Sequence, residues 1–368
     1  MTDGRVFGMG ASPLAEPDWP PPELDEIAEV VPHSGRPEPV SVEWRSPRPL
    51  SSTSLVRTGG ERLVVKRLPI ALRDTAALAE EHAYMDHLRA HGIPVPRVPR
   101  TVTRGEFVYE TQEVGTGADL YRRSFSWSPY LSVAQAAASG RMLARLHHAA
   151  EGYDAPARPP RPLQAGLCTD LVATVEEWAA RRPELADFLA AHRWREDIAA
   201  LRSESHPLRA EVPDLPALWT HNDWHGTNLL WTGDEVTAVI DFGLANRTTA
   251  VFDVATAIER FAVDWLSLRA GGPARVPVDQ LTAFLDAYRA ARPLSDAERE
   301  ALPALFPLVH VVYELSEIEY FLTVLPRPNH ENADIAYRDH LLGHLRWAGS
   351  GAGREFLGLL SALCYRPV

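Results

Sequence analysis

The stretch HNDWHGTNLLWTGDEVTAVIDFG, residues 221–243, constrains the fold of this chain more than any other segment. Its apolar runs NLLW and VTAVIDF flank the turn-forming letters TGDE, a pattern that predicts a β-hairpin. Such a hairpin brings Asn228, at its start, close to Asp241, at its end. An amide oxygen and a carboxylate suit Mg²⁺. Asp223 precedes the hairpin, where a carboxylate can accept a hydroxyl proton and orient that oxygen for attack on phosphorus.

These residues resemble the kinase superfamily. His221, Asp223 and Asn228 match the pattern H-x-D-x-x-x-x-N, and Asp241 opens the triplet D-F-G. Within the superfamily, DWHGTNLLW is similar to a motif of the aminoglycoside phosphotransferase and choline kinase branch, as are GRMLARLHHA and GIPVPRV. The resemblance covers roughly residues 45–270.

The resemblance implies an α+β, bilobal, protein-kinase-like fold with ATP and Mg²⁺ as cofactors. Asp223 is then the catalytic residue, and Asn228 and Asp241 are the metal ligands. Residues 1–37 are expected to form a Pro-rich extension that contains one short helix. Residues 38–114 are expected to form the β-rich, nucleotide-binding N-lobe, and residues 115–368 a larger helical C-lobe.

The segment after D-F-G separates two kinds of kinase. Only LANRTTAVF lies between Gly243 and Asp253, and it contains no A-P-E triplet, with which protein kinases end their substrate platform. The spacing therefore favours a small-molecule acceptor. Asp253 resembles the D-[LV]-A motif of the small-molecule branch, which implies that it braces the catalytic loop. His221 is expected to brace the same loop through backbone bonds.

Lys66 is the only lysine among 37 lysine and arginine residues, and it lies on a predicted strand. The resemblance assigns it to the α- and β-phosphates of ATP, where a compact ammonium suits a narrow slot better than a guanidinium. Glu81, on the following helix, is its expected partner. Val64 shares the strand face of Lys66 and is expected against adenine. The remaining expected nucleotide contacts are Ser51, Ser52, Thr53, Gln112 and Val114.

The net charge and the hydropathy of the chain indicate which classes of binding partner are expected. The net charge of −12 disfavours nucleic acid, which needs a basic surface, and it is compatible with a cationic small substrate as well as with plain solubility. No apolar run of about 18 residues predicts a membrane span, and the N-terminus lacks the features of a signal peptide. We therefore expect a cytoplasmic protein without a membrane partner.

The acceptor is the least determined feature. The resemblance implies that acidic residues on C-lobe helices meet amino groups of the substrate; the candidates are Glu259, Asp264, Glu314 and Glu317. An antibiotic of the aminoglycoside type, and hence a role in resistance, fits this set. Homoserine, choline, methylthioribose or another metabolite also fits. A protein Ser/Thr kinase of the stress-response type and a non-catalytic nucleotide-binding module are the remaining alternatives.

Overall fold

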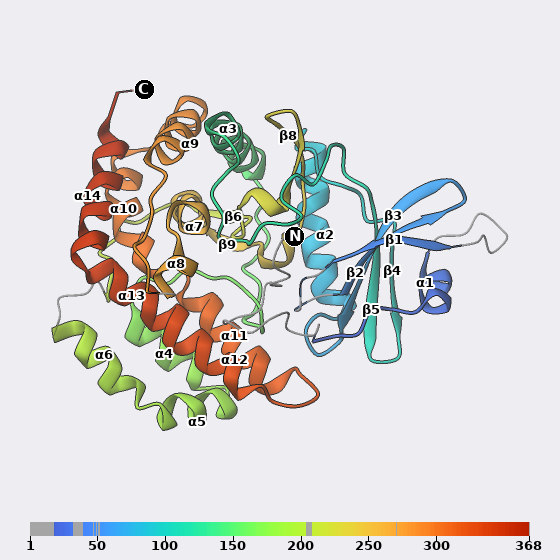
Figure 1. Ribbon diagram of the computed structural model, residues 1–368, viewed down its shortest axis with the longest axis horizontal. Coiled ribbons are helices and arrows are strands. Elements are labelled where there is room, and N and C mark those ends of the chain that lie inside the picture. Colours follow the sequence, from blue (N-terminus) through green and yellow to red (C-terminus); the bar gives the residue numbers. More distant parts are fainter. Residues whose placement is uncertain are drawn as a thin grey trace. The chain divides into compact units, whose positions relative to one another are not determined.

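A computed structural model describes residues 18–31, 40–46, 48, 50, 52–203, 208–269 and 271–367. The chain divides into two compact units (Figure 1). The smaller unit comprises Met1–Thr116 together with Ala238–Ile240. The larger unit comprises Gly117–Thr237 and Asp241–Val368.

The smaller unit is built on a five-stranded antiparallel sheet in the order β1-β2-β3-β5-β4. Its strands are β1 (Ser41–Arg45), β2 (Ser52–Thr58), β3 (Glu61–Pro69), β4 (Arg100–Arg104) and β5 (Phe107–Glu113). A hairpin at the letters TGGE joins β2 to β3, and its Gly59 and Gly60 have the positive φ angles that such a turn needs. The sequence interpretation did not include β4. The expected sheet-rich part of the α+β fold is thereby confirmed.

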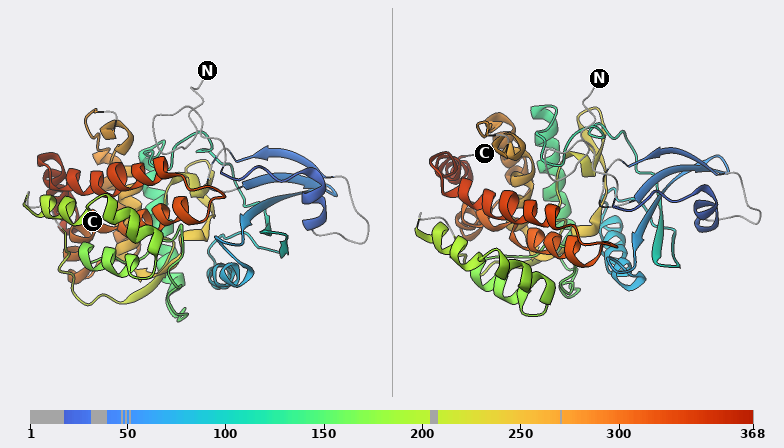
Figure 2. Two further views of the ribbon diagram at one scale, coloured as in Figure 1. Left: turned by 90° about the horizontal axis from the view of Figure 1, so that it is seen from below. Right: turned by 60° about the horizontal axis from the view of Figure 1, so that its bottom comes forward.

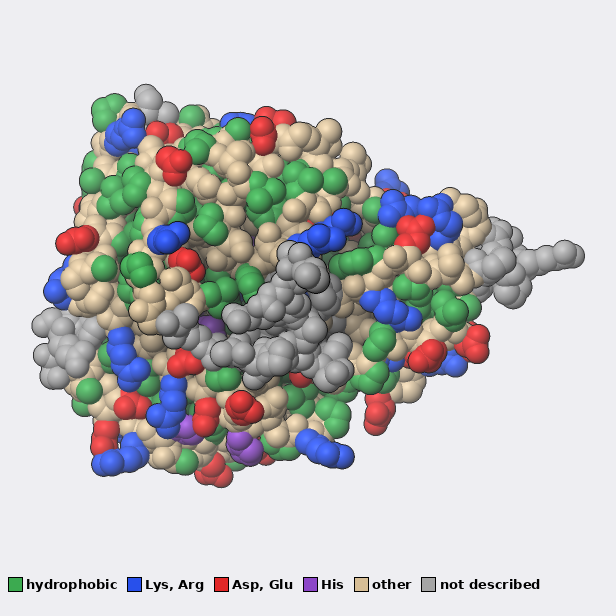
Figure 3. Space-filling view, viewed as in Figure 1, with side chains coloured by type: hydrophobic (Ala, Val, Ile, Leu, Met, Phe, Trp, Pro, Cys, Tyr) green, Lys and Arg blue, Asp and Glu red, His purple; other side chains and the backbone are tan. Residues whose placement is uncertain are grey.

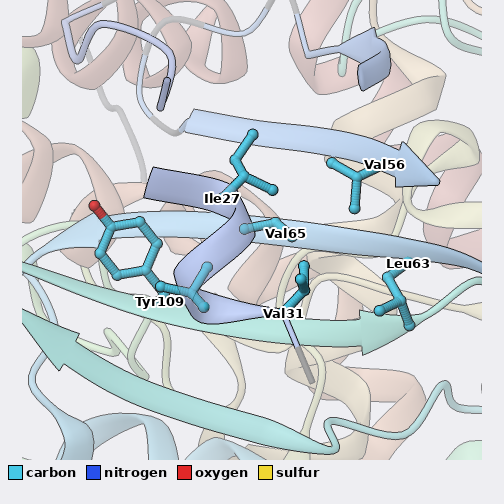
Figure 4. Close-up of a cluster of buried hydrophobic side chains, with 7 residues drawn as sticks. Ile27, Val31, Val56, Leu63, Val65 and Tyr109 are labelled. Atoms are coloured by element: carbon cyan, nitrogen blue, oxygen red, sulfur yellow. The ribbon is translucent and has the colours of Figure 1, made fainter. Parts of the chain in front are cut away.

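The helix expected in the Pro-rich segment is present as α1 (Leu24–Val30) and packs on this sheet (Figure 4). The buried cluster consists of Ile27, Val30, Val31, Val56, Leu63, Val65 and Tyr109. Glu26 adds polar contacts, because it accepts hydrogen bonds from Arg67, at 3.0 Å, and from Tyr109. The segment before β1 therefore contributes to the core of the smaller unit.

Helix α2 (Thr75–Ala90) follows β3 as the periodicity predicts. Asp74 caps its N-terminus by accepting a hydrogen bond from the backbone N–H of Ala77 at 2.7 Å. The chain leaves the helix through Gly92, whose φ of +82° favours glycine. The buried face of α2 includes one acidic side chain, Glu81.

The larger unit is mostly helical, as expected. Its helices are α3 (Val133–Ala150), α4 (Leu171–Ala179), α5 (Pro183–Ala191), α6 (Trp194–Ser203), α7 (Ala250–Ala262), α8 (Trp265–Arg269), α9 (Val278–Ala291), α10 (Asp296–Leu305), α11 (Val311–Thr323), α12 (His330–Ile335), α13 (Leu342–Gly349) and α14 (Gly351–Tyr365). Helices α4 and α5, drawn in green, pack beside α11, drawn in orange (Figures 1 and 2). Helices α3 and α9 approach closely at Gly140, where a Cβ atom would lie 2.2 Å from the carbonyl oxygen of Phe284.

Two small antiparallel sheets carry the loops of the site. Strand β7 (Leu229–Thr232) pairs with β8 (Glu235–Val239), which confirms the hairpin predicted from the sequence. Strand β6 (Ala217–Thr220) pairs with β9 (Asn246–Thr249), a pairing that the sequence interpretation did not include. One helical stretch, Asp296–Thr323, is long and apolar enough for a membrane span, but 83% of its apolar window is buried inside the structure.

Candidate active site

Asp253 holds the loop between β6 and β7 through hydrogen bonds to its backbone. Its side chain is fully buried near the start of α7 and accepts hydrogen bonds from two consecutive backbone N–H groups, those of His221 at 2.9 Å and Asn222 at 2.8 Å. The Nε2 atom of His147 lies 3.1 Å from the same carboxylate, and its Nδ1 atom lies 2.7 Å from the hydroxyl of Tyr288. Burial lowers the pKa of His147, so we take its ring as neutral, with Nε2–H donating to Asp253. These contacts support the bracing role expected of Asp253.

The loop needs this bracing because its backbone is strained at Asn222, which has a positive φ of 60°. Thr220 donates to the side-chain oxygen of Asn222 at 2.9 Å, and the amide of Asn222 donates to the carbonyl of Leu244 at 3.2 Å. His221 contributes as well. Its Nδ1 accepts a bond from the backbone N–H of Asp223 at 3.2 Å, and its ring packs against Phe242.

The carboxylate of Asp223 is contacted on both oxygens, and its side chain is 17% exposed. Asn228 Nδ2 donates to Oδ2 at 2.9 Å. His225 Nε2 lies 3.2 Å from Oδ1, and Arg260 Nη2 lies 3.3 Å from the same atom. Burial alone would raise the pKa of Asp223, but the positive charges of His225 and Arg260 outweigh it and hold that pKa well below its usual range. Asp223 is therefore ionised and fixed in orientation.

The two expected metal ligands follow on the same chain segment. Within the part of the chain that the structure describes, the side-chain hydrogen bonds of Asn228 all use Nδ2, which leaves Oδ1 available to a cation. Asp241 ends the hairpin with a left-handed backbone (φ 63°, ψ 72°), which is costly for a residue with a side chain and concentrates at functional sites. A carboxylate and an amide oxygen fit Mg²⁺ in donor chemistry.

A pocket lies next to Asp223 in the larger unit. It is lined by Trp127, Ala165, Asn222, Thr256, Glu259, Arg260, Val309, His310, Tyr313 and Glu314. Two of the four expected acceptor residues, Glu259 and Glu314, are in this lining. Glu317 lies one turn further along α11 and accepts a hydrogen bond from Tyr313 at 3.1 Å. Asp264 instead accepts a bond from the backbone N–H of Ser267 at 3.0 Å and caps α8.

Burial changes the ionisation of these acids. It raises the pKa of Glu259 to about 7, although Arg260 opposes the shift. Burial, together with the neighbouring Glu317, raises the pKa of Glu314 well above its usual range. The pocket therefore differs from a solvated acidic face, because its carboxyl groups hold protons readily at neutral pH.

The expected nucleotide residues lie in the smaller unit. Val64 and Lys66 are both half-buried and share one face of β3, with Gln112 and Glu110 directly opposite on β5 and Thr53 opposite Lys66 on β2. Ser52 is buried and Val114 is 37% exposed, whereas Ser51 lies outside the described residues. Glu81 is buried as expected of an ion-pair partner, and its carboxylate lies 3.3 Å from Arg73 Nε. These roles remain predictions.

Sequence reasoning missed several side chains of the site. Arg260 and Trp127 received no role, Tyr313 was passed over for its acidic neighbours, and His225 was left without an assignment. Glu110, opposite Lys66, was not singled out either. It is buried and bonded to His82 at 2.8 Å and to Gln112 at 2.7 Å. Alternation along β5 could have identified Glu110, but no local pattern marks Arg260 or Trp127.

A braced loop aspartate, an asparagine and an aspartate suited to a divalent cation, and an adjoining pocket form an arrangement that suits phosphoryl transfer. The chain belongs to the phosphotransferase enzyme family, whose model matches residues 48–294. It is 28% identical to a homoserine kinase of Bradyrhizobium sp. (strain ORS 278), over 65% of this chain and 68% of that protein. It is 30% identical to a homoserine kinase of Nitrobacter winogradskyi, over 65% of this chain and 67% of that protein. Among solved structures, a type VIII aminoglycoside-3'-phosphotransferase is 20% identical, with a TM-score of 0.43 over 72% of this chain and 88% of that one.

Proposed function

We propose that this protein transfers the γ-phosphate of ATP to a hydroxyl group of a small molecule. The observation that carries the proposal is the Asp223 carboxylate, which is held on both oxygens beside a pocket. In that position Asp223 would orient the acceptor hydroxyl and take up its proton. Catalysis would then rest on positioning and on electrostatic stabilisation by fixed groups.

Asn228 and Asp241 would hold Mg²⁺, because Oδ1 of Asn228 accepts no hydrogen bond from the described residues and Asp241 supplies a carboxylate. A bound Mg²⁺ would neutralise charge on the transferred phosphate. Asn228 also orients Asp223, because its Nδ2 donates to both the backbone carbonyl and the side chain of Asp223. One residue would thus couple the position of the metal to that of the catalytic carboxylate.

Lys66 would contact the α- and β-phosphates of ATP, with Glu81 fixing its position and Val64 against adenine. Thr53, beside Lys66 on the neighbouring strand, would donate to the phosphates, and Ser51 and Ser52 would join it. Gln112 and Val114 would lie along the adenine-binding segment. Glu110 lies opposite Lys66 in the strand register and is a second buried acidic residue in this part of the smaller unit.

A small acceptor is favoured over a protein. The segment after Asp241 passes from the short turn Phe242–Leu244 into β9 and then directly into α7. It is buried or half-buried throughout and offers no extended platform of the protein-kinase type among these described residues. We therefore rank the protein Ser/Thr kinase below a small-molecule kinase.

The acceptor class has two candidates. A cationic antibiotic of the aminoglycoside type agrees with the net charge of −12. A hydroxy metabolite of the homoserine type is the second candidate, favoured by the buried guanidinium of Arg260 in the pocket and by the names of two relatives. On the face of the larger unit drawn in Figure 3, basic and acidic side chains are interspersed, which agrees with our proposal that the protein has no nucleic-acid partner. We also propose a cytoplasmic location.

The test is an ATP-consumption screen over aminoglycosides, peptide antibiotics and primary-metabolite alcohols. Asp223→Ala should abolish transfer to any acceptor found and leave ATP affinity nearly unchanged, because Asp223 contacts the acceptor and not the nucleotide. Asp187→Asn, an exposed change on α5, is the matched control. Near-normal turnover by Asp223→Ala would contradict the proposed role of Asp223 in phosphoryl transfer. ATP binding without transfer across the whole panel would favour a non-catalytic nucleotide-binding module.

A further inference from the structure

Arg260 is a buried cation whose hydrogen-bond donors are not all used by the described residues. It lies on α7, its side chain is 9% exposed, and it lines the pocket beside Asp223. Its nearest carboxylate oxygens are Oδ1 of Asp223, 3.3 Å from Nη2, and Oε2 of Glu259, 3.8 Å from Nε. The Nε atom is buried and has no hydrogen-bond partner in the part of the chain that the structure describes. Buried polar groups are normally satisfied, so this guanidinium is short of an acceptor.

The surroundings of Arg260 suit a flat anionic group. The guanidinium carbon lies 5.3 Å from the ring centre of Trp127 and 5.4 Å from that of Tyr313. Both rings line the same pocket and limit access of water to the cation. Glu314 lines the same pocket and has a buried Oε2 atom without a hydrogen-bond partner among the described residues. The pocket thus contains a guanidinium and a carboxyl group that each have an unsatisfied hydrogen-bonding atom among the described residues.

We infer that Arg260 binds a carboxylate of the acceptor and that Glu314 binds its ammonium group, so that the substrate class is a short hydroxy amino acid. A guanidinium fork matches a carboxylate in geometry and charge. The inference rests on the proposed function, because Asp223 must hold the acceptor hydroxyl. Since Nη2 of Arg260 lies only 3.3 Å from Asp223, the carboxylate and the hydroxyl of the acceptor are separated by a few bonds.

A polycationic acceptor fits this pocket less well. Arg260 would face one of its ammonium groups at short range, without solvent to screen the repulsion. The carboxyl groups of Glu259 and Glu314 are buried close to Arg260, and burial favours their neutral forms. A zwitterion offers a partner to Arg260 and to Glu314 at once. Its ammonium favours the ionised form of Glu314, while its carboxylate satisfies Arg260.

Three compounds distinguish the contribution of the acceptor's carboxylate from that of its ammonium group. Homoserine carries both, aminopropanol lacks the carboxylate, and hydroxybutanoate lacks the ammonium. We expect wild-type protein to bind homoserine more tightly than either truncated probe in isothermal titration calorimetry, and to phosphorylate it with the highest kcat/KM. Arg260→Gln should reduce the ratio of homoserine to aminopropanol kcat/KM by about 10- to 100-fold, the amount expected from losing charged hydrogen bonds. Glu314→Gln should reduce the ratio of homoserine to hydroxybutanoate similarly.

The ratio within one variant removes any general damage to Asp223, which would lower transfer to all acceptors alike. Arg141→Gln, an exposed change on α3 whose arginine pairs with Glu235, is the matched control and should leave both ratios unchanged. An unchanged ratio in Arg260→Gln would overturn the inference and leave Arg260 as a positioning residue for Asp223. Wild-type transfer to an aminoglycoside and to none of the carboxylate probes would overturn the inference while the proposed function stands. Arg260-dependent binding of homoserine without any phosphoryl transfer would support the inference and overturn the proposed function.

Discussion

Replacement of Asp253 by asparagine tests how the loop that carries Asp223 is held. The wild-type carboxylate accepts from the backbone N–H groups of His221 and Asn222 and from the ring of His147. Asparagine has nearly the same size but only one acceptor oxygen. Whichever way its amide is turned, at least one backbone N–H of the loop faces an NH₂ group instead of an oxygen.

The loss of stability follows from the hydrogen bonds that are lost. In the less destabilising orientation the NH₂ group faces the backbone N–H of Asn222, so one hydrogen bond to a charged acceptor is lost. Such a bond contributes about 1.5–3 kcal/mol, and a buried N–H group left unpaired adds to the loss. We expect Asp253→Asn to lower the free energy of unfolding by about 2–4 kcal/mol. For a chain of 368 residues that corresponds to a decrease in Tm of roughly 3–5 °C.

Activity should fall as well. A displacement of the catalytic group by about 1 Å costs on the order of 100-fold in rate, so kcat should decrease by about 10- to 100-fold while the KM for ATP changes little. The assays are thermal unfolding and steady-state transfer, with Asp187→Asn as the matched exposed control. A Tm and a kcat within error of wild type would refute the view that Asp253 braces the loop.

Two further predictions concern packing and pH. Gly140→Ala should lower Tm, because the new methyl group would lie 2.2 Å from the carbonyl oxygen of Phe284 and force α3 away from α9, at about 1–3 kcal/mol. Gly358→Ala on α14 has open space and should be neutral or stabilising by up to about 1 kcal/mol. Burial raises the pKa of Glu259 to about 7, so its contribution to stability is present below about pH 4.5 and is lost as pH rises through 7. Glu259→Gln cannot ionise, and its Tm relative to wild type should therefore be higher at pH 8 than at pH 5; an equal difference at both pH values would contradict the assignment.

Local features of this chain were predictable from its sequence. The β7–β8 hairpin follows from two apolar runs around TGDE, the turn between β2 and β3 from its glycines, and α2 from its periodicity and its closing Gly92. In each case a few neighbouring residues determine the element. The position of Asp223 next to Asn228 is of the same kind, because a single loop and its short helical turn connect them.

The walls of the pocket were not predictable in this way. Trp127, Arg260 and Tyr313 come from three separate segments, and only the packing of the helical unit brings them together. Glu314 was chosen for its charge, yet its burial beside Arg260 depends on the same packing. Strand β6 was missed because its four residues, Ala217–Thr220, are too few for an alternating pattern to identify. Tertiary contacts decided these features, and no local pattern encodes them.

The strained backbone of the site indicates that the larger unit by itself holds the proposed catalytic residue, Asp223, in place. Asn222 and Asp241 both have positive φ angles, which cost on the order of 1 kcal/mol or more for residues with side chains. Asn222 is held against that cost by Asp253 on one side and by the carbonyl of Leu244 on the other. The strained conformation directs the next residue, Asp223, toward His225, Asn228 and Arg260, so its carboxylate is oriented within a single unit of the protein. Because this strain is offset by hydrogen bonds that already exist, acceptor binding does not have to supply the ordering of the loop, and its free energy can go into recognition of the acceptor.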